Sequence, residues 1–124
     1  YTYLWWREHE AGEDSGRKVR PCVVVVAVHS EGGEALRVAV AAVSHVPPAD
    51  RAAVEMPLAV KRSLGLDSLQ SWVICDEINH FQWPGFDFGR TPNGARTFGR
   101  IPDALLQKVK KLLADTRTKT VNRD

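Results

Sequence analysis

The stretch Gly16–Val28, with the sequence GRKVRPCVVVVAV, decides the fold of this 124-residue chain. Three cationic side chains precede Pro21, and four consecutive valines follow Cys22. A valine run without polar alternation predicts a strand that is buried on both faces. Because the residue before a proline favours extended backbone, we expect Arg20 to lie already on the path of this strand. Its fixed guanidinium would suit a phosphate; the alternative is a solvated basic loop with Arg20 in a structural ion pair.

The composition limits the class of protein. Hydrophobic residues make up 44% and charged residues 26% of the chain, which is ordinary for one globular domain. We find neither a signal peptide nor an apolar run of about 20 residues, so we expect a cytoplasmic protein without a membrane partner. The start at Tyr1, without methionine, leaves open whether residues are missing before it. Cys22 and Cys75 lie in apolar runs, which predicts two reduced, buried thiols; a disulfide between neighbouring strands is the alternative.

Charge is distributed unevenly along the chain. Residues 107–124 carry six cationic and two acidic side chains, although the formal net charge of the whole chain is only +2. A mildly acidic body with a basic end is not typical of a general DNA-coating protein. We predict a single domain over residues 1–115 and a basic tail over residues 116–124, which solubilises the chain or contacts nucleic acid.

Runs of β-branched and aromatic residues between turn signals predict a mainly β fold. The expected strands cover residues 1–7, 21–29, 35–43, 53–56, 71–76 and 97–101. Residues 9–19 and 77–94 are expected to be irregular, and residues 57–64 to form a short helix. A second helix begins at Pro102-Asp103 and is amphipathic, with apolar positions at Leu105, Leu106, Val109, Leu112 and Leu113. We therefore expect a small barrel-like β fold with two peripheral helices.

The order of these elements resembles the MazF/PemK-like toxin family. The motifs that carry the resemblance are Gly16-x-x-x-Arg20-Pro21 before the valine strand, Ser44 at the end of the next strand, Ser71–Asn79, and Arg100-Ile101-Pro102. The resemblance covers most of Tyr1–Leu113 and is weakest over residues 80–99. It implies an SH3-like barrel that forms a homodimer and is inhibited by a cognate antitoxin. It also implies metal-independent cleavage of single-stranded RNA without a cofactor.

The family's catalytic arginine corresponds to Arg20, and its strand-end threonine corresponds to Ser44. RNA supplies its own nucleophile, the ribose 2′-hydroxyl, so the protein has to stabilise phosphorane charge and move protons. Arg20 would stabilise the charge, and Ser44 would donate a hydrogen bond to a phosphate oxygen. The alternative role of Ser44 is to satisfy nearby backbone groups at the end of its strand.

Further residues are candidates for the same site. His45 follows Ser44 and is a candidate general base or acid, although neighbours on a strand face opposite sides and His45 can therefore point away. We expect Arg17, Lys18, Asn79 and Trp83 to bind RNA. The aromatic segment 81–88 would stack on unpaired bases or, alternatively, cover a barrel end or a dimer interface.

The residues give little support for other chemistry. The four histidines lack metal-ligand spacing, and we predict no metal site. Asp76 and Glu77 are neighbours that would face apart on a strand, so we expect no acid–base pair; Asp76 would instead orient an arginine, Arg20 included. Two other functions stay open. One is a non-catalytic toxin-like barrel that binds a protein target, as in the gyrase inhibitors related to CcdB, and the other is an SH3-like binding domain without toxicity.

Overall fold

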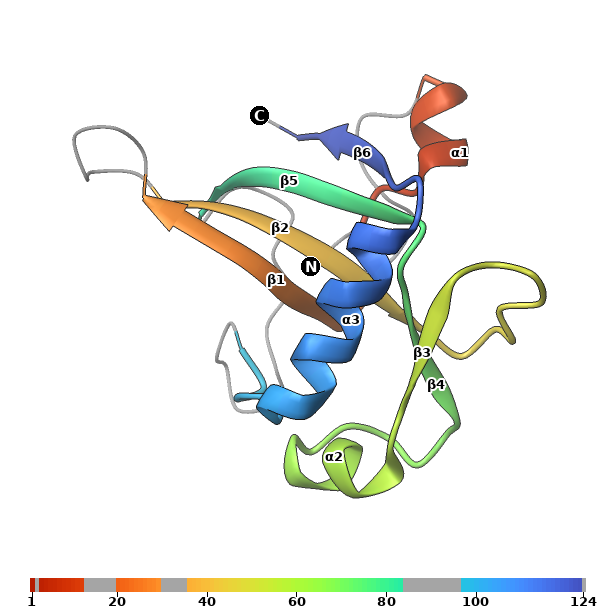
Figure 1. Cartoon of the computed structure of the whole chain (residues 1–124), viewed down its shortest axis with the longest axis vertical. Coiled ribbons are helices and arrows are strands. Elements are labelled where there is room, and N and C mark those ends of the chain that lie inside the picture. The colour runs from red at the N-terminus through yellow and green to blue at the C-terminus, as the bar shows by residue number, and fades with distance from the viewer. Residues whose placement is uncertain (2, 13–19, 30–35, 84–96, 124) are drawn as a thin grey trace.

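The computed structural model describes residues 1, 3–12, 20–29, 36–83 and 97–123. Its elements are three helices and six strands (Figure 1). In chain order these are α1 (Trp6–Glu10), β1 (Cys22–His29), β2 (Leu36–Ser44), β3 (Ala53–Met56), α2 (Leu58–Ser63), β4 (Ser71–Ile74), β5 (Glu77–Trp83), α3 (Asp103–Asp115) and β6 (Lys119–Asn122). The prediction of a mainly β fold is confirmed.

The six strands form an open mixed sheet rather than the closed barrel that the sequence predicts. The strand order is β3-β4-β2-β5-β6. Strand β2 also pairs with β1, which lies outside this order. All pairs are antiparallel except β5 with β6. Within the described ranges, β1 pairs only with β2 and β6 only with β5, so no ladder joins the ends of the sheet.

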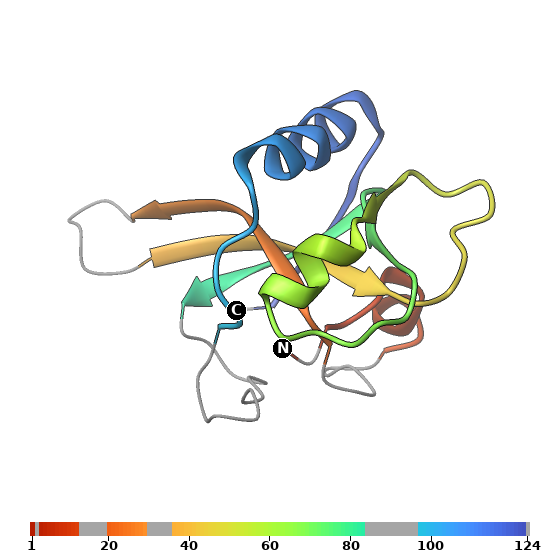
Figure 2. The same cartoon turned by 90° about the horizontal axis from the view of Figure 1, so that it is seen from below.

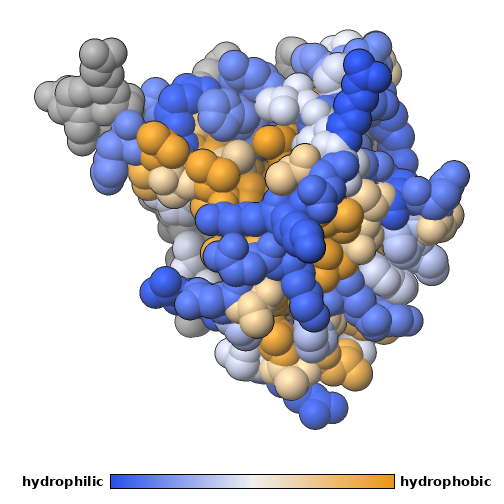
Figure 3. Space-filling model, viewed as in Figure 1, coloured by the Kyte–Doolittle hydropathy of each residue, from blue (hydrophilic) through white to orange (hydrophobic). Residues whose placement is uncertain are grey.

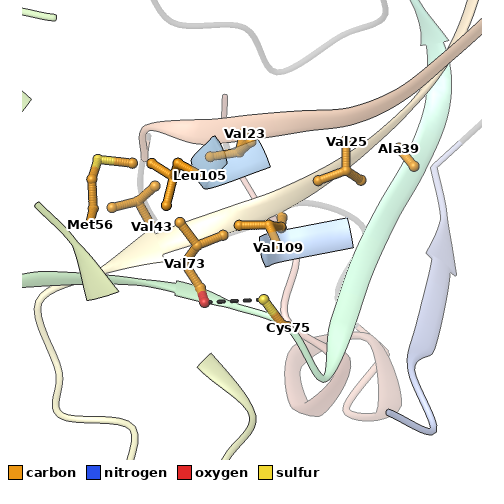
Figure 4. Packing of buried hydrophobic residues seen from close by; sticks show 10 residues of the cluster. Val23, Val25, Ala39, Val43, Met56, Val73, Cys75, Leu105 and Val109 are labelled. Carbon is orange, nitrogen blue, oxygen red and sulfur yellow. Dashed lines mark hydrogen bonds between the residues drawn. The ribbon is translucent and has the colours of Figure 1, made fainter. Parts of the chain in front are cut away.

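The central strand is β2, and it separates two cores. Successive side chains of a strand point to opposite faces, and both faces of β2 are buried. On one face lies the helix-side core, in which Val23 and Val25 of β1 pack with Leu105 and Val109 of α3 (Figure 4). On the other face lies the N-terminal core, which contains Tyr3, Trp5, Val38, Val40, Ala42, Ile74 and Phe81. The predicted apolar face of the C-terminal helix is therefore confirmed.

The prediction that the valine run is buried on both faces is wrong. Val23 and Val25 are buried, whereas Val24, Val26 and Val28 are 41%, 48% and 57% exposed. The register with β2 shifts between Val24 and Val26, so this strand contains an irregularity within the run. The double burial that an all-apolar strand suggests belongs to β2 instead, because the helix-side core covers one face of β2 and the N-terminal core covers the other.

The N-terminal segment is not the predicted strand. Tyr3–Trp5 is extended, and α1 begins at Trp6 because two carboxylates accept the first backbone N–H groups. Glu8 Oε1 accepts from Trp5 N at 3.0 Å, and Glu77 Oε1 accepts from Trp6 N at 2.8 Å. Trp5 is buried in the N-terminal core. Trp6 is half-buried and is the first residue of α1, so the two indoles do not lie on opposite faces of a strand.

Three further predictions about elements need correction. The segment after Asp76 is not irregular throughout, because β5 covers Glu77–Trp83. Its inward positions include the polar side chains Glu77 and Asn79, which hide the period of a strand. Residues 97–101 form no strand. The basic C-terminal segment is more than a solvated tail, because it contains β6, in which Val121 is fully buried.

The two faces of the sheet carry different elements. Figure 2 shows α3 on one side of the sheet and α1 with the N-terminus on the other. The outer side of α3 is hydrophilic (Figure 3), as expected for an amphipathic helix that covers a core. In the part of the chain that the structure describes, no helix has the length and apolar character needed to cross a membrane.

Candidate functional site

A cavity of about 190 Å³ brings three predicted catalytic residues together. Arg20, Ser44 and His45 all line it, and the remaining polar lining comes from Lys61, Asp67 and Ser71. We call it the Arg20 cavity. Arg20 comes from the residues that lead into β1, whereas Ser44 and His45 come from the end of β2, which pairs with β1.

Arg20 is held in place by its backbone and by an indole. Its N–H donates to the carbonyl oxygen of Tyr1 at 2.8 Å, and its guanidinium carbon lies 5.1 Å from the ring centre of Trp5. Burial lowers the pKa of Arg20, but an arginine remains protonated at any physiological pH. Among the described residues, no carboxylate forms an ion pair with this guanidinium. The charge of the buried Glu8 acts on the same guanidinium and raises its pKa, against the effect of burial.

Ser44 is the last residue of β2 and is buried. Its Oγ accepts a hydrogen bond from the N–H of Val46 at 3.1 Å, which turns the chain away from the strand. The backbone-satisfying role that we considered from the sequence is therefore present. It does not exclude the other role, because a hydroxyl that accepts one hydrogen bond can still donate its own proton.

His45 lies on the same cavity as Ser44 because the strand ends between them. The alternation of side chains applies within β2, and His45 is the first residue after it. Its Nε2 lies 3.0 Å from Oδ2 of Asp67, and both side chains are about half exposed. A histidine whose Nε2–H donates to a carboxylate presents Nδ1 as the basic nitrogen. The geometry is therefore that of an oriented general base.

A buried lysine holds Asp67 in position. Lys61 is only 1% exposed, and its Nζ donates to Asp67 Oδ1 at 2.5 Å and to Ser71 Oγ at 2.6 Å. It also donates to the carbonyl oxygen of Leu69. The hydrogen bond from Lys61 lowers the pKa of Asp67, and the backbone N–H of Leu69 and the charge of His45 act in the same direction. Asp67 and Lys61 were not predicted, because nothing in their spacing connects them to His45.

Arg20 also lines a second, mainly apolar cavity of about 320 Å³. Its lining includes Val24, Met56, Trp83 and the 40% exposed Phe98. We call it the apolar cavity. Arg20 lines both cavities. An anion at its guanidinium would therefore lie next to the polar Arg20 cavity and next to the apolar cavity.

The four predicted RNA-binding residues have different outcomes. Trp83 lines the apolar cavity next to Arg20. Asn79 is fully buried, and its amide bonds to the backbone of Leu4, so we correct its assignment to a structural role. Arg17 and Lys18 lie outside the described residues.

The prediction that Asp76 orients an arginine is confirmed, whereas the prediction that Asp76 and Glu77 face apart is wrong. Asp76 orients Arg51 rather than Arg20, through hydrogen bonds of 2.9 and 2.6 Å. The two carboxylates do not face apart, because Arg51 also donates to Glu77 Oε2 at 2.9 Å. The chain bends at Asp76 between β4 and β5, which allows both side chains to reach one guanidinium. Burial raises the pKa of Glu77, against the effects of the Trp6 N–H and Arg51.

Both cysteines are free thiols, as predicted. Burial raises the pKa of Cys22 to about 12 and that of Cys75 to about 11. Such thiols are poor nucleophiles near neutral pH. Within the described ranges, no three His, Cys, Asp or Glu side chains are grouped as ligands of a metal ion would be.

The chain has no match among protein-family models, curated proteins or solved structures. Its function therefore has to be argued from the geometry of the Arg20 cavity.

Proposed function

We propose that the protein is an endoribonuclease that cleaves single-stranded RNA by attack of a ribose 2′-hydroxyl on the adjacent phosphate. The observation that carries this proposal is the convergence of Arg20, Ser44 and His45 on one cavity, with His45 oriented by Asp67. This arrangement offers a fixed cation, a hydroxyl donor and a basic nitrogen, which are the groups that the reaction requires.

The geometry supports the following roles. His45 removes the proton of the 2′-hydroxyl, and the O2′–P bond forms while the bond from phosphorus to the 5′-oxygen breaks. Because the attacking and leaving oxygens lie on opposite sides of phosphorus, a water molecule donates the proton to the departing 5′-oxygen, and the imidazolium of His45 then loses its proton to solvent. The products are a 2′,3′-cyclic phosphate and a 5′-hydroxyl. Arg20 stabilises the negative charge of the phosphorane, and the Ser44 hydroxyl donates to one of its oxygens. No cofactor takes part in these steps.

The apolar cavity supports the choice of a single strand as substrate. A phosphate at Arg20 would place a flanking base beside Trp83 and Phe98, which line this cavity. Aromatic side chains stack on unpaired bases of any sequence, whereas the bases of a duplex are already stacked and paired. The homodimer and the cognate antitoxin that the family resemblance implies remain predictions.

The proposal is tested with two oligonucleotides of one sequence, an unstructured RNA and the same strand in which every ribose is a deoxyribose. Both are incubated with the protein in EDTA, and the product ends are identified by mass spectrometry. We expect RNA fragments that end in cyclic phosphate and no cleavage of the deoxy strand. Cleavage of the deoxy strand, or RNA products with 3′-hydroxyl ends, would refute attack by the 2′-hydroxyl.

A further inference from the structure

A third cavity, of about 390 Å³, is lined by Trp5, whose ring contacts Arg20 of the sites described above. Its lining includes Trp5, Trp6, Arg7, Arg117 and Lys119, together with the ion-pair cluster of Arg51 with Asp76 and Glu77. We call it the tryptophan cavity. It joins α1 to the segment that leads into β6, two elements that contact each other in the fold.

The tryptophan cavity has more cations than its carboxylates can neutralise. Both carboxylates are bonded to Arg51, as described above. Arg7, Arg117 and Lys119 are exposed and form no ion pair with any residue that the structure describes. The Lys119 ammonium lies 5.6 Å from the ring centre of Trp6. Three cations next to an indole form a site suited to an anion that carries an aromatic group.

One indole connects this cavity to the Arg20 cavity. The guanidinium carbons of Arg7, Arg20 and Arg51 lie 5.7, 5.1 and 5.2 Å from the ring centre of Trp5. Arg20 lines the first site, whereas Arg7 and Arg51 line the tryptophan cavity. Trp5 is 5% exposed, and its Nε1 has no hydrogen-bond partner among the described residues. The two sites are therefore neighbours, because the buried Trp5 lines the tryptophan cavity and contacts the guanidinium of Arg20.

We propose that the tryptophan cavity binds a second phosphate of the nucleic-acid strand whose scissile phosphate lies at Arg20. The inference rests on the proposed function and adds a substrate property to it. A substrate has to extend beyond the scissile dinucleotide for full affinity. Arg117 and Lys119 contact the second phosphate, and Trp6 stacks on its base.

The test measures binding rather than cleavage, with oligodeoxythymidylates as probes that lack the 2′-hydroxyl. A dinucleotide carries one phosphate between its sugars, and a nonamer is long enough to fill both sites. Titrations in EDTA compare R117A/K119A with K110A/K111A, a control that removes two exposed cations from α3. We expect R117A/K119A to weaken nonamer binding by about tenfold and to reduce the log–log salt slope by about one unit. Its dinucleotide binding, and both affinities of the control, should be unchanged.

Four results would overturn the inference. The first is nonamer binding that is equally strong in R117A/K119A and K110A/K111A; if R20A still weakens it, the Arg20 site stands without the second phosphate site. The second is a parent protein that binds the nonamer no more tightly than the dinucleotide. The third is an affinity for inorganic phosphate, lost in R117A/K119A, that equals the affinity for the nonamer, since the cavity would then be a site for the free ion. The fourth is displacement of the nonamer by a hexaglutamate peptide at a lower concentration than the dinucleotide needs as a competitor. The cavity would then be a site for an acidic protein segment.

Discussion

The side-chain amide of Asn79 makes two hydrogen bonds to the backbone of a single residue, Leu4. Its Oδ1 accepts from the Leu4 N–H at 2.9 Å, and its Nδ2 donates to the Leu4 carbonyl oxygen at 2.8 Å. These two hydrogen bonds hold the N-terminal segment against β5. They take the place of the backbone hydrogen bonds that a neighbouring strand would make. The next residue along the chain is Trp5, whose ring contacts the Arg20 guanidinium. Asn79 therefore supports the site from within the core.

Replacement of Asn79 by alanine should lower the free energy of unfolding by about 2–4 kcal/mol. The substitution leaves a buried N–H and a buried carbonyl oxygen of Leu4 without partners, and each such group costs about 1–3 kcal/mol. Urea denaturation followed by circular dichroism measures the change. Gln107→Ala, which removes an amide from an exposed position of α3, serves as the control. Equal midpoints for the two variants would show that the Leu4 contact contributes nothing.

The C-terminal strand should be required for stability. Val121 is fully buried in β6, whereas its neighbour Thr120 is exposed. Replacement of Val121 by aspartate places an unpaired charge in the core and should cost about 3 kcal/mol or more. Thr120→Asp adds the same charge at the surface and should change the stability by less than about 0.5 kcal/mol. Thermal unfolding of the two variants measures the difference, and similar melting temperatures would mean that residues 116–124 are a tail after all.

The two thiols should react slowly in the folded protein. With a pKa of about 12, Cys22 has a thiolate fraction of about one in a thousand at pH 9, whereas an unfolded thiol is about half ionised there. Because the folded pKa lies above the unfolded value, this group also makes folding less favourable as the pH rises above 9. Reaction with Ellman's reagent at pH 9, with and without guanidinium chloride, measures the accessible thiols. Rapid reaction of both the half-buried Cys22 and the buried Cys75 without denaturant would contradict their raised pKa values.

Asp67 should act on catalysis through His45. Asp67→Asn keeps the shape of the side chain but removes the charge that orients and stabilises the imidazolium, so we expect kcat to fall by about tenfold or more. A double-mutant cycle distinguishes positioning from folding, because Asp67→Asn should lower the rate in the parent protein and not in the His45→Gln background. Asp50→Asn, at an exposed turn, provides the matched control. An unchanged rate in Asp67→Asn, or the same fold loss in the His45→Gln background, would remove Asp67 from the mechanism.

Local sequence patterns predict most of the sheet, and the failures have physical reasons. Strand β3 and the apolar face of α3 follow from local period and turn residues alone. Strand β5 was missed because its buried face carries Glu77 and Asn79, whose partners lie more than 70 residues away in sequence. The prediction of a closed barrel was wrong, because the residue pattern of a strand does not specify which other strand pairs with each of its edges.

The site shows the same division. Arg20 and Ser44 follow from short motifs, and His45 joins them because its strand ends one residue earlier. Asp67 and Lys61 could not be predicted, because their contact with His45 depends on how the turn after α2 meets the end of β2. Local patterns thus predict candidate groups, whereas only the tertiary structure shows which of them share a cavity.

The most direct test of the Arg20 cavity as a catalytic site is the single-turnover cleavage rate of an unstructured RNA in EDTA, at saturating protein. Arg20→Ala is compared with Arg62→Ala, which removes an exposed arginine from α2. We predict that Arg62→Ala cleaves at the parent rate. Arg20→Ala should be slower by about a hundredfold or more, since it loses about 3 kcal/mol of charge stabilisation. Equal rates for the two variants, or no cleavage by the parent protein in EDTA, would contradict the proposed mechanism.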